Sequence, residues 1–164
     1  MKTHFKFPTL SSGSLAAVLL SLSCAAWAHG DVTPQAVDTS TLPPLGAAWK
    51  NENPYRSNAA AIKVGTSAYT QNCARCHGLD AISGGIAPDL RRLDNECSTQ
   101  KDVKKQAMCV RDVDEYFLGK FRRGVTRNGA VYMPPFEGIL NQEAAWSIKS
   151  YLETRREKPL LATK

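Results

Sequence analysis

The sequence predicts an all-α fold of one domain whose helices are joined by long loops. Three segments carry apolar residues at three- and four-residue steps, which is the period of an α-helix. No convincing run of alternating strand residues appears anywhere in the chain. The chain has 164 residues, of which 43% are hydrophobic and 22% are charged. These values suit one domain with extensions and exclude a wholly disordered chain or a polytopic membrane protein.

Residues 1–28 are expected to be a secretory signal peptide, which predicts a periplasmic protein. Two lysines precede a short apolar stretch, and a small-x-small motif ending at Ala28 predicts a mature start at His29. The apolar stretch is shorter than the ~20 residues that cross a bilayer. An uncleaved anchor and a lipoprotein acylated at Cys24 are the alternatives.

Without the signal the chain would carry 19 basic and 15 acidic residues, because the signal contains two of the 21 basic residues and no acid. This mild excess lacks the concentrated basic stripe of a nucleic-acid binder. We therefore expect no nucleic-acid partner, although the charge permits steering toward an acidic protein.

The segment after the signal is expected to be an extended arm. It contains four prolines and should begin without regular structure, then wrap the domain through Trp49 and Tyr55. A disordered linker is the alternative. The predicted divisions are the arm at 29–58, the main domain at 59–157 with an insertion at 94–112, and a tail at 158–164.

The first predicted helix covers residues 62–71, where Ile62, Gly65 and Tyr69 recur at helical spacing. Gly65 would allow a second helix to approach closely, and Tyr69 supplies a large apolar body with a polar tip. An ordinary core helix is an equally compatible reading.

The motif Cys73-Ala74-Arg75-Cys76-His77 follows this helix and matches the attachment signal for c-type haem. Two thiols at this spacing reach the two vinyl groups on one side of a porphyrin, and the next residue places an imidazole under the iron. A thioredoxin-like redox pair and half of a zinc site are the alternatives. Neither requires the histidine that follows, and the second half of a zinc motif is missing.

Pro88 is a candidate partner of His77. Its carbonyl could accept a hydrogen bond from the imidazole, which would fix the tautomer of the ring and raise its basicity as a ligand. A simple turn proline is the alternative.

A second helix is predicted at residues 112–123, where Val113, Phe117 and Phe121 repeat at four-residue steps. Gly124 would end it in a favoured C-cap position. Beyond it, Met133 precedes the rigid segment Pro134-Pro135-Phe136, which could hold a thioether against iron. A core-filling role is the ordinary fate of a methionine, and Met108 or an open iron are the alternatives for the sixth ligand.

The last predicted helix follows Asn141, a favourable N-cap residue. Ala145, Ile148 and Leu152 form one apolar stripe, with Trp146 and Tyr151 expected at its margins. This helix is expected to cross the one at 62–71.

These features together resemble a class I cytochrome c over residues 59–156. The resemblance implies a fold of three to five helices around one covalent haem c, with thioethers from Cys73 and Cys76 and axial ligands from His77 and Met133. It also implies an electron carrier rather than an enzyme. The supporting strings within the family are Asn51-Glu52-Asn53-Pro54-Tyr55-Arg56, Gly119-Lys120-Phe121-Arg122-Arg123-Gly124 and Tyr132-Met133-Pro134-Pro135-Phe136.

Those strings look most like the periplasmic cytochrome c-550 type that serves PQQ-dependent alcohol dehydrogenases. The resemblance therefore implies such a dehydrogenase as electron donor, a downstream cytochrome or terminal oxidase as acceptor, and a monomer. A haem enzyme and a gas sensor with a displaceable methionine are the rival classes. Candidate charges at the docking rim are Arg75, Lys120, Arg122, Arg123 and Arg127.

The insertion at 94–112 departs from a minimal cytochrome. It carries Cys97 and Cys109, for which we expect a disulfide in an oxidising periplasm, against two free thiols.

Overall fold

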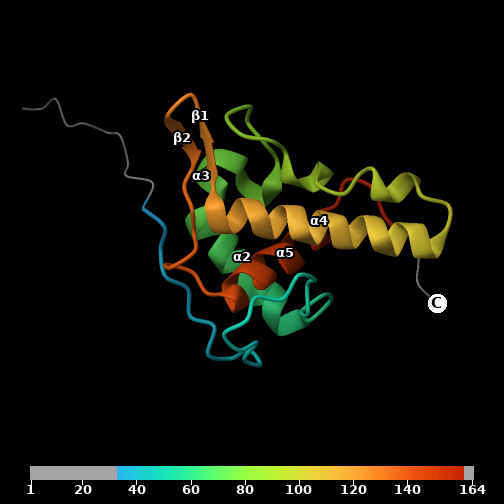
Figure 1. Ribbon diagram of the computed structural model, residues 1–164, viewed down its shortest axis with the longest axis horizontal. Helices are drawn as coiled ribbons and strands as arrows, with labels where there is room; N and C mark the ends of the chain where they lie inside the picture. Colours follow the sequence, from blue (N-terminus) through green and yellow to red (C-terminus); the bar gives the residue numbers. More distant parts are fainter. Residues whose placement is uncertain (1–32, 161–164) are drawn as a thin grey trace, which may run out of the picture. The chain divides into compact units, whose positions relative to one another are not determined.

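Residues 33–160 are described by the structure, a computed structural model (Figure 1). The predicted signal peptide lies outside the described residues. No helix in the described part is long and apolar enough to cross a membrane. The elements in order are α2 (Ala59–Asn72), α3 (Ala74–His77), the 3-10 turns η1 (Leu79–Ala81), η2 (Leu90–Arg92) and η3 (Cys97–Thr99), α4 (Val103–Arg123), β1 (Val125–Arg127), β2 (Ala130–Met133) and α5 (Gln142–Thr154).

The crossing of α2 and α5 forms the centre of the domain. Helix α2 begins three residues earlier than predicted, because the Asn58 side chain caps it by accepting a hydrogen bond from the Ala61 amide. Gly65 meets the backbone of α5 so closely that a Cβ there would lie 1.9 Å from the Ser147 carbonyl oxygen. The predicted crossing is thus present, and it requires glycine at this position.

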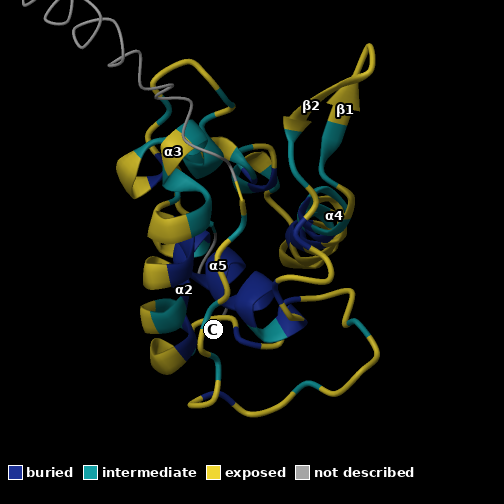
Figure 2. Cartoon of the chain, turned by 90° about the vertical axis from the view of Figure 1, so that its left-hand side faces the viewer, coloured by how far each residue is buried: buried dark blue, intermediate teal, exposed yellow. Residues whose placement is uncertain are grey.

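Helix α5 is buried on nearly every side (Figure 2). Asn141 caps it as predicted, with its side chain accepting a hydrogen bond from the Ala144 amide. Trp146 and Tyr151, predicted at the margins of the apolar stripe, are buried as well, at 0% and 2% exposed. The arm and α4 cover the face that a two-helix packing would have left open.

The described part of the arm, residues 33–58, contains no helix or strand but packs against the domain. Tyr55 is 3% exposed and belongs to an apolar cluster with Leu42 and Trp146. The arm amides also find partners in α5: Leu45 donates to the Glu143 carboxylate at 2.7 Å. A disordered linker is therefore wrong for these residues.

A buried group of charges joins the arm to α4 and α5. Lys149 is 1% exposed, and its ammonium lies 3.1 Å from Asp114 and 2.8 Å from Glu153. The Asp114 carboxylate also accepts from the Asn53 amide at 2.9 Å and pairs with Arg56. Each buried charge thus has an opposite charge and hydrogen bonds, which fixes the three segments relative to one another.

Helix α4 is nine residues longer at its start than predicted. It begins at Val103 because the Asp102 side chain caps it by accepting from the Lys105 amide. Much of the predicted insertion is therefore helix.

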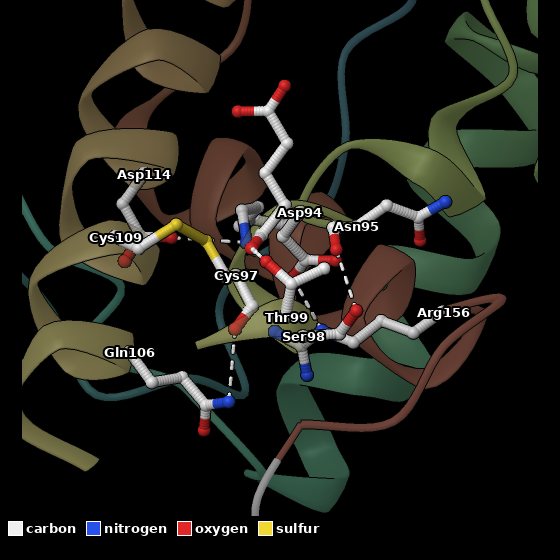
Figure 3. Close-up of a disulfide and its surroundings, with 11 residues drawn as sticks. Asp94, Asn95, Cys97, Ser98, Thr99, Gln106, Cys109, Asp114 and Arg156 are labelled. Atoms are coloured by element: carbon white, nitrogen blue, oxygen red, sulfur yellow. Dashed lines mark hydrogen bonds and ion pairs between the residues drawn. A yellow bond between two sulfur atoms is a disulfide. The ribbon is translucent and has the colours of Figure 1, made fainter. Parts of the chain in front are cut away.

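The structure bonds Cys97 to Cys109 with the Cα atoms 5.5 Å apart, and the Gln106 side chain donates to the Cys97 carbonyl at 3.1 Å (Figure 3). The early turns of α4 are thereby tied to η3.

Removing this disulfide is expected to cost about 2–3 kcal/mol of stability in the chain-entropy model. The double variant Cys97→Ala, Cys109→Ala should show that loss in urea unfolding of the oxidised protein. The wild type treated with reductant serves as the control and should lose a similar amount. Two thiols that can be alkylated in the unreduced wild type would contradict the prediction.

A short antiparallel hairpin follows α4, although no strand was predicted. Strands β1 and β2 pair with Thr126 opposite Val131 and Arg127 opposite Ala130. Asn128 and Gly129 form the turn with φ of 50° and 78°. An Asn-Gly pair is the usual signal for such a two-residue turn, and the strands escaped notice because they are only three and four residues long.

Candidate haem site

The two thiols and the imidazole of the C-x-x-C-H motif lie on a single turn of helix. The amide of Cys73 donates to Tyr69 at the end of α2, and the amide of His77 donates to the Cys73 carbonyl at 2.9 Å. This turn places Cys73 and Cys76 one helical step apart on one side of α3, with His77 following. The three groups therefore share one short rigid element.

The Tyr69 ring links this turn to the helix crossing. Its hydroxyl donates to the Gly78 carbonyl at 2.8 Å, and its ring lies 5.1 Å from that of Tyr151. Burial raises the pKa of Tyr69 well above its usual value, so that the hydroxyl keeps its proton and remains a donor. Gly78, the residue after His77, is therefore hydrogen-bonded to a tyrosine of the core.

His77 is oriented by the backbone of a distant loop. Its Nδ1 lies 2.8 Å from the Pro88 carbonyl oxygen. Because a carbonyl can only accept, the proton must be on Nδ1, and Nε2 is left with a lone pair for a metal. The arrangement is that of a histidine prepared as a ligand.

The loop carrying Pro88 is itself stiffened by Asp89. Its carboxylate accepts from the Arg91 amide at 3.1 Å and from the Arg91 guanidinium at 2.7 Å. The Arg91 hydrogen bonds lower the pKa of Asp89 to about 2, so that the carboxylate stays charged at any ordinary pH. Sequence reasoning assigned no such role to this pair.

Met133 ends β2 and is half-buried against the main core cluster. Gly124, at φ +65°, passes so close that a Cβ would lie 2.3 Å from the Met133 carbonyl oxygen. After the two prolines, the Phe136 amide donates to the Phe121 carbonyl at 3.0 Å. Residues 133–137, called the methionine segment from here on, therefore contact the end of α4 at two points, Gly124 and Phe121.

The surroundings fit a haem. Helix α3 and the hairpin lie on opposite sides of the upper part of the domain (Figure 2). Large apolar side chains that are more than half exposed follow the histidine and precede the methionine, as an apolar macrocycle between them requires. They are Leu79, Ile82, Ile86, Val131 and Tyr132.

The alternatives for the cysteines and for the sixth ligand fit less well. Burial raises the pKa of the Cys73 thiol to about 12, which leaves it without the thiolate that a redox pair needs. Among the described residues, no group of three His, Cys, Asp or Glu could hold a metal such as zinc. Met108 lies 56% exposed on α4, beside the disulfide, rather than on the hairpin.

The candidate rim charges are not equivalent. Arg122 forms an ion pair with Glu137 at 2.6 Å. Arg127 lies exposed on β1, with its guanidinium 5.8 Å from the centre of the Tyr132 ring. Arg75 is exposed on α3, within the haem motif itself. Arg127, on the hairpin that carries Met133, and Arg123, at the end of α4, are exposed charges on the methionine side of the site.

The chain is similar in sequence to several known proteins. A family model described as cytochrome c oxidase, cbb3-type, subunit III, matches residues 60–152. A cytochrome c550 of Pseudomonas aeruginosa is 50% identical over 146 residues, covering 87% of this chain and 91% of that protein. No solved structure gives a significant match.

Two quinohemoprotein alcohol dehydrogenases of Pseudomonas putida match more weakly. ADH-IIG is 33% identical over 99 residues and ADH IIB is 28% identical over 123 residues. The matched segments cover 60% and 73% of this chain but only 11% and 15% of the dehydrogenases. The similarity is therefore to a small part of each enzyme.

Proposed function

The chain belongs to the cytochrome c family, and from that premise we propose that it is a periplasmic monohaem carrier between a PQQ-dependent alcohol dehydrogenase and a downstream cytochrome or terminal oxidase. Family membership makes it an electron carrier rather than an enzyme and implies covalently bound haem c. When bound, the haem supplies one-electron redox chemistry at its iron. The donor, the acceptor, the compartment and the single haem are the proposed parts.

The residues that would hold the haem follow from the site. Cys73 and Cys76 would provide the thioethers, and His77 and Met133 would provide the two ligands to the iron. The observation that carries the assignment of His77 is the 2.8 Å contact between its Nδ1 and the Pro88 carbonyl, because it leaves Nε2 free to ligate. A methionine on the other side favours the reduced iron and raises the potential.

The choice of donor is supported by the two dehydrogenases. Each contains, within its own chain, a segment similar to this protein. A separate chain of the same kind is suited to exchange electrons with an enzyme of that class. The sequence similarity to a cytochrome c550 over most of the chain supports the same choice.

A periplasmic location is supported by two features. The predicted signal peptide would export the chain, and the Cys97–Cys109 bond suits an oxidising compartment. We also propose that the protein acts as a monomer, since an electron carrier needs an accessible haem edge for two partners in turn.

Reduction of the oxidised holoprotein by a purified PQQ-dependent alcohol dehydrogenase should be fast in stopped-flow absorbance. Methanol- and sulfur-compound-oxidising dehydrogenases serve as comparisons and should react more slowly.

If basic residues steer the encounter, the bimolecular rate should fall by roughly an order of magnitude between low and physiological ionic strength.

The variant Arg127→Gln tests the steering directly. It should lower the rate at low salt and flatten the salt dependence, because it removes an exposed charge beside the site. Arg92→Gln is the matched control, since Arg92 is also exposed but lies on η2, where it pairs with Glu157. Equal rates with all dehydrogenases would overturn the proposed donor, and a flat salt dependence would remove the steering.

A further inference from the structure

Among the arm residues, Trp49 packs against the core cluster that contains Phe136, three residues beyond Met133. The residues on either side of Trp49 are held by the same buried side chain at the start of α5. Gln142, 4% exposed, accepts from the Lys50 amide at 3.1 Å and donates to the Ala48 carbonyl at 3.1 Å. The indole is therefore fixed in place by backbone hydrogen bonds rather than by its own contacts alone.

A chain of rings joins Trp49 to the segment after Met133. The Trp49 ring lies 6.3 Å from Phe121, and Phe121 stacks on Phe136 at 5.3 Å with an interplanar angle of 23°. Phe121 and Phe136 are each 3% exposed. Phe136 is three residues beyond Met133 and also donates its amide to Phe121.

A second connection runs through a charge. The Arg122 guanidinium lies 5.0 Å from the centre of the Trp49 ring and donates to the Glu137 carboxylate at 2.6 and 3.0 Å. The Arg122 hydrogen bonds, with a smaller contribution from Arg123, lower the pKa of Glu137. Two successive residues of α4 thus connect one arm tryptophan to two successive residues of the methionine segment.

The hairpin alone provides little support for Met133. It has only two strands, and a two-stranded hairpin is marginally stable by itself in water. Both strands are largely exposed, with Val131 at 64% and Tyr132 at 67%. Stabilisation of the sulfur position must therefore come mainly from the residues after Met133 and from what they pack on.

We propose that Trp49 is a positioning residue for the Met133 sulfur, acting through Phe121 and Phe136 and through Arg122 and Glu137. The inference rests on the proposed role of Met133 as axial ligand. In this arrangement the arm is a brace for the distal ligand. Loosening the brace raises the population of a locally open state, in which the sulfur has left the iron while the domain stays folded.

Binding of imidazole to the oxidised holoprotein measures that open state directly. Imidazole competes with the methionine for the iron, so its apparent affinity is the intrinsic affinity multiplied by the open fraction. We expect Trp49→Ala to bind imidazole roughly tenfold more tightly than the wild type. Trp49→Phe, which keeps a ring for Phe121 and Arg122, should restore most of the difference.

Arg122→Gln provides a second, milder variant in case Trp49→Ala folds poorly. It removes one of the two connections and should tighten imidazole binding by about two- to threefold. Arg92→Gln is the matched control, because it breaks an exposed ion pair on η2 that belongs to neither connection, and it should leave imidazole affinity unchanged. Circular dichroism during heating reports global stability for each variant.

The outcomes separate the brace from the ligand assignment. Unchanged imidazole affinity in both Trp49→Ala and Arg122→Gln would overturn the brace. So would a change in Arg92→Gln as large as that in Arg122→Gln. If Met133→Ala bound imidazole no more tightly than the wild type, the proposed ligand itself would be wrong, whatever the Trp49 variants showed.

Discussion

Met133→Ala is expected to abolish the weak red absorption band that reports methionine–iron ligation in oxidised class I cytochromes c. The side chain that replaces the thioether cannot reach or bind iron. Because axial ligands tune haem over ~0.8 V, loss of the sulfur should lower the reduction potential by on the order of 100 mV or more. The visible spectrum and a redox titration of the holoprotein would measure both effects.

Met108→Ala is the matched control for this change. Met108 is the other methionine within the described residues, and it lies largely exposed on α4. Its removal should leave the band and the potential unchanged. Retention of the red band in Met133→Ala, or its loss in Met108→Ala, would refute the ligand assignment.

Gly65→Ala is expected to destabilise the domain by about 3 kcal/mol or more. A Cβ at this position would lie 1.9 Å from the Ser147 carbonyl oxygen and 3.0 Å from the Ile148 amide nitrogen, which are backbone atoms of α5. The two helices would have to separate, and Trp146 and Tyr151 would lose packing. Alanine favours a helix over glycine by about 1 kcal/mol, which is too little to offset the clash. Urea unfolding of the holoprotein would measure the loss.

Gly119→Ala tests the same substitution where space permits it. Gly119 lies on α4, and a Cβ there would meet only the flexible end of the Arg123 side chain at 2.8 Å. The arginine can move, so the helix propensity should dominate and stabilise the protein by up to about 1 kcal/mol. Opposite signs for the two variants are the expected result, and equal destabilisation would contradict the argument from the helix crossing.

Features that depend on neighbouring residues were largely predictable. The resemblance to a cytochrome c rests on the spacing of Cys73, Cys76 and His77, and the comparisons confirm it. The Asn141 cap and the closeness of Gly65 to α5 were read from the sequence for a similar reason. The cap depends on one side chain acting within one helical turn, and the close approach depends on the absence of a side chain at one position.

Other features were missed or misplaced. The start of α4 was placed too late because the turns tied by the Cys97–Cys109 bond carry many charged residues and show little apolar periodicity. The hairpin strands were too short to show alternation, and the Asn128-Gly129 turn was the signal that could have revealed them.

The sequence by itself determined the haem motif, the family and the main helices, because these depend on spacings within a few residues. Only the tertiary structure decided that Trp146 is fully buried and that the Trp49 ring lies close to Phe121 and to the Arg122 guanidinium. Those contacts join residues far apart in the chain. They depend on how the arm, α4 and α5 fill the same space, which no local pattern of residues encodes.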